Sequence, residues 1–132
     1  MNAQARAYHT QAVFTASPGQ LVLLLYDGAL RFMAQARAGF ARPVADPGRT
    51  EAINAALDRA QAVVAELKAN LDHATGGEVA RNLDRLYDYH LRRLFAAKME
   101  RDEAPVSEVE GLVRALRDAW AEMLASGTAQ AA

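Results

Sequence analysis

The 132-residue sequence has no cysteine, only 4 prolines and few β-branched residues. Without cysteine the chain has no disulfide framework, no thiol nucleophile and no thiolate metal site. Strands favour β-branched and aromatic residues, so their scarcity argues against an all-β fold. Alanine is abundant instead, at 30 positions. Because alanine loses no side-chain entropy in a helix, the composition predicts an all-α protein.

The sequence also lacks a charge excess and long apolar runs. The net charge is −1 and the pI is about 6.3, which gives no electrostatic case for binding nucleic acid or an anionic membrane. No run reaches 18 apolar residues, and residues 1–10 contain no hydrophobic signal region. We therefore expect a cytoplasmic protein without membrane insertion, forming a single helical domain over residues 1–132.

Breakers and caps divide the chain into four helices. Ser17 predicts a cap, Pro18 occupies the first helical position, and Gln20 completes a capping box. A second capping box is expected at Ser107–Glu110, after a break at Ala104-Pro105, and Gly127 is a stop signal. The expected helices span about 17–40, 50–71, 77–99 and 107–125, behind an N-terminal extension, 1–16.

Short connections between helices of this length place consecutive helices antiparallel. The sequence thus predicts an antiparallel up-down-up-down four-helix bundle. The apolar spacing assigns a core face to each of the last three helices. Those faces are Ile53, Leu57, Ala60, Val64, Leu67 and Leu71; then Val79, Leu83, Leu86, Tyr87, His90, Leu91 and Leu94; then Val109, Leu112, Val113, Leu116, Trp120, Met123 and Leu124.

No pattern indicates catalysis, a metal or a cofactor. Di-metal bundles use Glu-x-x-His pairs, and the sequence has none. The lone His90 is expected to be a hydrogen-bonded core residue. Asp84 and Asp88 share a face with Arg81, Arg85 and Arg92, which predicts solvated ion pairs within that helix. We therefore expect a protein that is not an enzyme.

Two helices carry more apolar surface than a bundle requires. Apolar residues of the first helix cover over half its circumference, whereas a bundle helix needs a stripe of about 100°. Either a partner or the N-terminal segment that contains Tyr8 must cover this excess apolar surface. The alternative is that the N-terminal segment is an ordinary packed extension with no covering role. The second helix carries small residues opposite its core stripe, namely Ala55, Ala62, Ala65 and Ala69.

The alanine face is either a shallow helix-docking site or a consequence of high alanine content. Asn82, Tyr89 and Arg93 of the third helix lie together beside the core arc, where they would form a polar rim next to such a site. The candidate binding residues are thus Tyr8, Ala62, Ala65, Ala69, Asn82, Leu86, Tyr89 and Arg93.

Several separate blocks, in order and with compatible spacing, resemble the flagellin-specific export chaperones of the FliS family. They are Ala16-Ser17-Pro18 with Gln20-Leu21, Leu25-Tyr26-Asp27-Gly28-Ala29, Gly76-Gly77-Glu78-Val79-Ala80, Asn82-Leu83, Leu86-Tyr87-Asp88-Tyr89, Glu108-Val109-Glu110-Gly111-Leu112 and Ala119-Trp120. Tyr8 matches the family's N-terminal tyrosine, in a segment that the family uses to cover or adjust the client site. The usual Met-Tyr opening is absent here.

The resemblance implies a cytoplasmic carrier that binds the disordered C-terminal segment of flagellin, prevents early polymerisation and helps deliver the client to the flagellar type III apparatus. It also suggests the export gate and other flagellar regulators as partners. Two alternatives stay open. One is a helical adaptor that self-associates as a homodimer through its alanine face, and the other is a metal- or haem-binding bundle, which the absence of ligand motifs disfavours.

Overall fold

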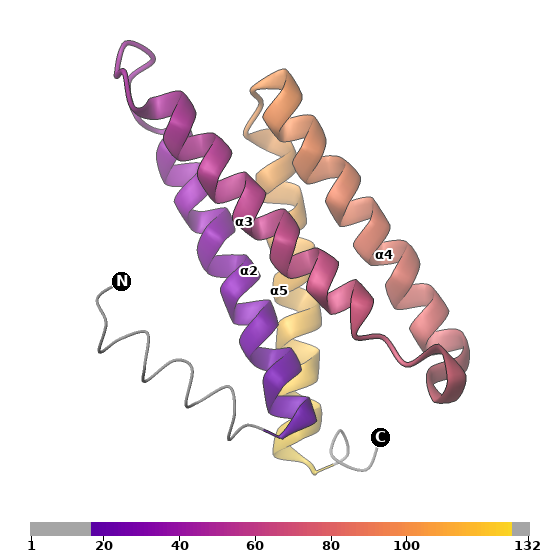
Figure 1. The fold of residues 1–132 in the computed structure, drawn as a ribbon. Coiled ribbons are helices and arrows are strands. Elements are labelled where there is room, and N and C mark those ends of the chain that lie inside the picture. The colour runs from indigo at the N-terminus through magenta and orange to yellow at the C-terminus, as the bar shows by residue number, and fades with distance from the viewer. Residues whose placement is uncertain (1–16, 128–132) are drawn as a thin grey trace.

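The computed structural model describes residues 17–127, which form four α-helices and no strand. α2 and α4 each pack on both α3 and α5, so α2 and α4 lie diagonally across the bundle. Figure 1 shows consecutive helices running antiparallel. The prediction of an antiparallel four-helix bundle is therefore confirmed, while the N-terminal extension lies outside the described residues. The helices are α2 (Pro18–Phe40), α3 (Arg49–Ala69), α4 (His73–Glu100) and α5 (Ala104–Ala125).

The core is built from the inward stripe of each helix. Its completely buried side chains include Met33 of α2, Ile53 and Leu57 of α3, Leu94 of α4 and Val109 of α5. Where α2 begins and α5 ends, the two helices approach so closely that a Cβ at Gly19 would lie 2.6 Å from Leu124 Cδ2. A larger residue at this position would require the Leu124 side chain to move.

The start of α2 is the predicted capping box. Ser17 Oγ accepts a hydrogen bond from the Gln20 amide at 3.2 Å, and Gln20 Oε1 accepts one from the Ser17 amide at 3.1 Å. Gly127 has φ 79, a value that favours glycine, directly after the last turn of α5. Both boundaries follow from local side-chain and backbone chemistry, which explains why the sequence predicts them.

The predicted start of α5 is wrong. The helix begins at Ala104, with Pro105 in its first turn, where the missing proline amide has no helical partner to lose. Asp102 Oδ1 instead accepts from the Ala104 amide at 3.1 Å. Ser107 is therefore exposed inside the helix, and Glu110 is buried rather than folded back as part of a capping box.

The fourth helix also begins earlier than expected, at His73. The carboxylate of Asp72 caps it by accepting hydrogen bonds from the amides of Ala74 and Thr75, each at 3.1 Å. Gly77 then interrupts the helix with φ 55 and ψ −130. Gly77 thus forms a kink within α4 and does not mark its beginning, since the side-chain cap lies upstream at Asp72.

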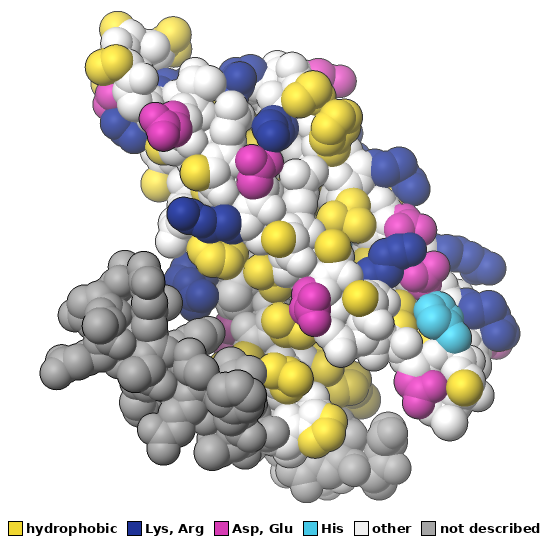
Figure 2. All heavy atoms as spheres, in the orientation of Figure 1, with side chains coloured by type: hydrophobic (Ala, Val, Ile, Leu, Met, Phe, Trp, Pro, Cys, Tyr) yellow, Lys and Arg dark blue, Asp and Glu magenta, His cyan; other side chains and the backbone are white. Residues whose placement is uncertain are grey.

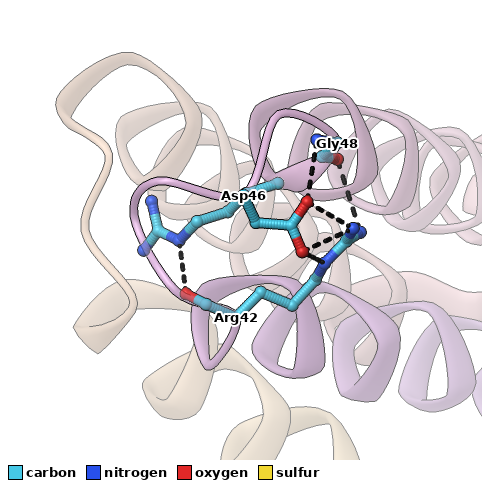
Figure 3. A network of polar contacts seen from close by, with 4 residues as sticks. Arg42, Asp46 and Gly48 are labelled. Carbon is cyan, nitrogen blue, oxygen red and sulfur yellow. Dashed lines mark hydrogen bonds and ion pairs between the residues drawn. The ribbon is translucent and has the colours of Figure 1, made fainter.

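The loop between α2 and α3 is held by its own side chains (Figure 3). The Arg42 guanidinium donates to both carboxylate oxygens of Asp46, at 3.0 and 2.9 Å. Asp46 Oδ1 also accepts from the Gly48 amide at 3.0 Å, and Arg49 donates to the carbonyls of Arg42 and Phe40. These bonds give partners to the Gly48 amide and to the carbonyls of Phe40 and Arg42, and they link the end of α2 to the first residue of α3.

None of the four described helices carries an apolar stretch sufficient for a membrane crossing. Within residues 17–127, no three histidine or carboxylate side chains gather where they would hold a metal ion.

Candidate functional site

The polar side chains predicted as a rim contact α5 from α4. Arg93 Nε donates to Glu108 Oε1 at 2.7 Å, and the Tyr89 hydroxyl donates to Glu108 Oε2. These hydrogen bonds from Tyr89 and Arg93 lower the pKa of the Glu108 carboxyl, and the bond to Glu108 raises the pKa of Tyr89. The three side chains therefore form a charged contact between the two helices at neutral pH.

Two further candidate residues continue the same row along α4. Asn82, Leu86, Tyr89 and Arg93 are separated by four, three and four positions, a spacing that keeps side chains on one side of a helix. Leu86 is 40% exposed and adds an apolar side chain to this otherwise polar row.

On α5, Leu112 follows Glu108 by one helical turn and is 39% exposed. Because α4 and α5 run antiparallel, Leu86 and Leu112 both lie beyond the Glu108 contact, toward the end where Figure 1 shows the two helices diverging. We call this area the α4–α5 surface. It comprises Asn82, Leu86, Tyr89 and Arg93 of α4 with Glu108 and Leu112 of α5.

Part of the predicted core is exposed near this end. Val79 is 67% exposed and Met123 is 37% exposed, although the apolar spacing assigns both to core faces. The helical period identifies the side of a helix that carries apolar residues, but it does not show how far two helices stay together. Where α4 leaves α5, the core face becomes surface.

A pocket of about 280 Å³ opens at the same end of the molecule and draws on all four helices. The hydroxyls of Tyr26 and Tyr87 hydrogen-bond to each other at 2.5 Å at its wall, and Trp120 Nε1 donates to the Gly19 carbonyl at 2.7 Å. These polar groups are already paired, so the pocket suits an apolar side chain better than a charged ligand. Its lining residues are Pro18, Gly19, Val22, Tyr26, Leu67, Asn70, Leu71, Asp72, Leu83, Tyr87 and Trp120.

The sequence does not reveal this pocket, because each helix contributes only a few of its residues. Helical periodicity describes one helix at a time, whereas the pocket depends on the ends of helices that are far apart in the chain. Figure 2 shows hydrophobic side chains gathered at this lower end of the bundle.

The alanine face lies elsewhere. Ala62, Ala65 and Ala69 are exposed on α3, and Ala55 is half-buried. Neighbouring Lys68 places its Nζ 3.2 Å from Asp84 and 3.0 Å from Asp88. On α4 these aspartates lie away from the row that meets Glu108, so the alanine face and the α4–α5 surface border different sides of α4. Tyr8 lies outside the described residues.

Two predictions about polar residues on α4 are wrong. Asp84 and Asp88 pair with Lys68 of α3 and not with the arginines of their own helix. His90 is completely buried, as expected, but neither ring nitrogen hydrogen-bonds to a described residue. Burial lowers the pKa of His90, which keeps the ring neutral and makes it a packing residue between the rings of Tyr87 and Tyr89.

Known proteins resemble this chain over most of its length. Residues 1–127 match the family model described as flagellar protein FliS. The flagellar secretion chaperone FliS of Salmonella typhimurium is 38% identical over 93% of this chain and 88% of its own length. The corresponding chaperones of Bacillus subtilis and Campylobacter jejuni are 35% and 33% identical, over 91% and 92% of this chain and 85% and 91% of theirs.

Proposed function

Since this chain belongs to the FliS family of flagellar secretion chaperones, we propose that it binds the disordered C-terminal segment of flagellin in the cytoplasm. Binding keeps the segment from polymerising early and assists its delivery to the flagellar type III secretion apparatus. The export gate and other flagellar regulators are further proposed partners. The family consists of chaperones and not of enzymes, so the protein acts by binding.

The observation that carries this proposal is apolar surface left open at one end of the bundle. Leu86 of α4 and Leu112 of α5 are both exposed at this end, where the apolar pocket also opens. A disordered segment that forms an amphipathic helix on docking would cover these side chains and place a large apolar side chain in the pocket. Such a client orders on binding, so it wraps a large area at the cost of part of its binding free energy.

The proposed client contacts fall into two groups. Asn82, Leu86, Tyr89 and Arg93 form the first, where Glu108 holds the two polar side chains in place. The alanine face forms the second, because small side chains allow close approach of another helix. Tyr8 stays a proposed contact from the family resemblance. The alanine residues concerned are Ala62, Ala65 and Ala69.

The test is to mix the purified protein with monomeric flagellin, either full-length or lacking its C-terminal segment, and to measure mass by size-exclusion chromatography with light scattering. We expect a one-to-one complex with the full-length protein alone. Leu86→Glu should weaken the complex at least about tenfold, since a charge would replace a buried apolar contact. Ala62→Glu and Ala65→Glu should also weaken it, while each changes the free energy of unfolding by about 0.5 kcal/mol or less.

Val44→Glu is the matched control, because Val44 is 85% exposed in the loop between α2 and α3, at the opposite end of the bundle. It should bind as the parent does. If Leu86→Glu and Val44→Glu bind equally well, the α4–α5 surface is not the client site. If folded protein forms no complex with either flagellin, the carrier function is wrong; a free protein of twice the chain mass would then favour the self-associating adaptor.

A further inference from the structure

The outer face of α4 carries three arginines that form no ion pair within the described residues. Arg81, Arg85 and Arg92 are exposed, and none of them forms an ion pair with a residue in 17–127. Their one polar contact in that range is a 3.4 Å hydrogen bond from Arg85 to Asn82. The nearest acidic residues in sequence, Asp84 and Asp88, instead share Lys68 of α3.

The same face continues into exposed apolar residues. Phe95 is 55% exposed and Met99 is 59% exposed. Positions 81, 85, 88, 92, 95 and 99 alternate in steps of four and three, the repeat by which one helix packs along another. This α4 stripe is about 27 Å long, and Asp88 within it forms an ion pair with Lys68, which it shares with Asp84.

Figure 2 shows the two halves of the stripe. Lys and Arg side chains gather along the lower half of α4, and hydrophobic side chains lie along its upper half. A surface that is basic at one end and apolar at the other has a direction, so it also fixes the orientation of whatever binds it.

We propose that the α4 stripe docks an amphipathic helix of a partner protein, with carboxylates opposite Arg81, Arg85 and Arg92 and apolar side chains opposite Phe95 and Met99. Charge complementarity places the acidic end of the partner helix opposite the arginines. Burial of Phe95 and Met99 stabilises the contact with its apolar end. A phosphate polymer would leave Phe95 and Met99 exposed. The overall net charge of −1 gives no attraction to an anionic membrane.

This docking surface goes beyond the proposed chaperone function. Tyr89 and Arg93 meet Glu108 on one side of α4, whereas the stripe passes Asp88, which meets Lys68 on another side. The α4–α5 surface and the stripe adjoin at one point, where Arg85 donates a 3.4 Å hydrogen bond to Asn82. The two surfaces share no residue, so the proposed partner would dock beside the client.

The test uses a fluorescent helical peptide of about 20 residues, with glutamates spaced to meet the arginines and leucines spaced to meet Phe95 and Met99. We expect it to bind the full chain at low salt, and anisotropy should show binding weakening as salt rises. The Arg81→Glu/Arg85→Glu double variant and the Phe95→Ala variant should each weaken binding at least about fivefold. A peptide with lysines in place of the glutamates should not bind.

The matched control is the Arg31→Glu/Arg59→Glu double variant, which reverses two exposed arginines on α2 and α3. It should bind the peptide as the parent does, and circular dichroism should show all variants equally helical. Equal loss in both double variants, or equal binding of a DNA duplex or an anionic vesicle, would mean that only general charge attraction operates. If excess flagellin displaces the peptide, the α4 stripe overlaps the client site and is not a separate docking surface.

Discussion

At the scale of single residues, the buried polar groups show how the helices are tied together. Burial raises the pKa of Tyr26 and Tyr87, so both hydroxyls stay protonated and hydrogen-bond across the bundle diagonal. Glu110 of α5 is 7% exposed and accepts from Arg37 of α2 at 2.7 Å. His90 is different, because neither ring nitrogen hydrogen-bonds within the described residues. Its burial is tolerated only in the neutral form.

His90 therefore makes stability depend on pH. Its pKa is lowered by burial, while the unfolded chain keeps a histidine pKa of 6.5. Below that value the unfolded state binds a proton that the folded state resists, so the free energy of unfolding should decrease as pH falls from 7.5 toward 5.5. One proton limits the slope to about 1.4 kcal/mol per pH unit. Urea titrations across this range should show the decrease, and His90→Phe should reduce it.

The control is His73→Gln, because His73 is exposed at the first residue of α4. This variant should keep the pH dependence of the parent, since it leaves the buried ring of His90 in place. A His90→Phe protein with an undiminished slope would place the acid sensitivity on other groups.

At the scale of helices, the two ends that the sequence marks with capping boxes behave differently. Ser17 caps α2 with its own hydroxyl, whereas Ser107 lies inside α5, whose start is set upstream by Asp102 and Pro105. Glu110 has the spacing of a capping partner but forms an ion pair with Arg37 of α2 instead. The same local pattern thus gives a cap in one place and an interhelical ion pair in the other.

Replacing the two serines separates these cases. Ser17→Ala should lower the free energy of unfolding by about 1 kcal/mol, because an amide in the first turn of α2 loses its acceptor. Ser107→Ala should change it by less than about 0.5 kcal/mol, since the side chain is exposed within a helix. Urea denaturation monitored by circular dichroism measures both. Equal losses would mean that Ser107 does cap α5.

At the scale of the whole molecule, α2 and α5 hold the bundle together at one corner of the end where the pocket opens. Trp120 of α5 packs against the core, lines the pocket and donates to the Gly19 carbonyl of α2. Next to it, α2 and α5 cross with no room for a Cβ at Gly19. The open apolar surface proposed for the client lies beside this closed corner.

Trp120→Ala should therefore destabilise the fold by about 3 kcal/mol, through lost apolar burial and the lost hydrogen bond to the Gly19 carbonyl. Trp120→Phe keeps most of the ring packing and should cost about 1 kcal/mol, mainly the hydrogen bond. Thermal and urea unfolding would measure the two losses. An alanine variant that unfolds at the parent's midpoint would show that the tryptophan only lines the pocket and does not close the bundle.

The sequence by itself determined the number of helices, most of their boundaries, the antiparallel order and the family. Caps, breakers and apolar spacing act within a few residues, so these features can be recognised without knowing the neighbours. The predicted start of α5 is wrong because the sequence offers two start signals, one at Asp102–Pro105 and one at Ser107–Glu110. In the folded protein Glu110 pairs with Arg37 of α2, so it is not available as a capping partner for Ser107.

Only the tertiary structure decided which apolar residues stay exposed and which charges find partners. Val79 and Leu86 have the spacing of core residues, yet they are exposed, and Asp84 and Asp88 pair with Lys68 of α3. The helical period fixes the direction of each side chain around its own axis. It does not fix how far a neighbouring helix stays packed against that face. Residues along the packed length form the core, and residues beyond it stay exposed.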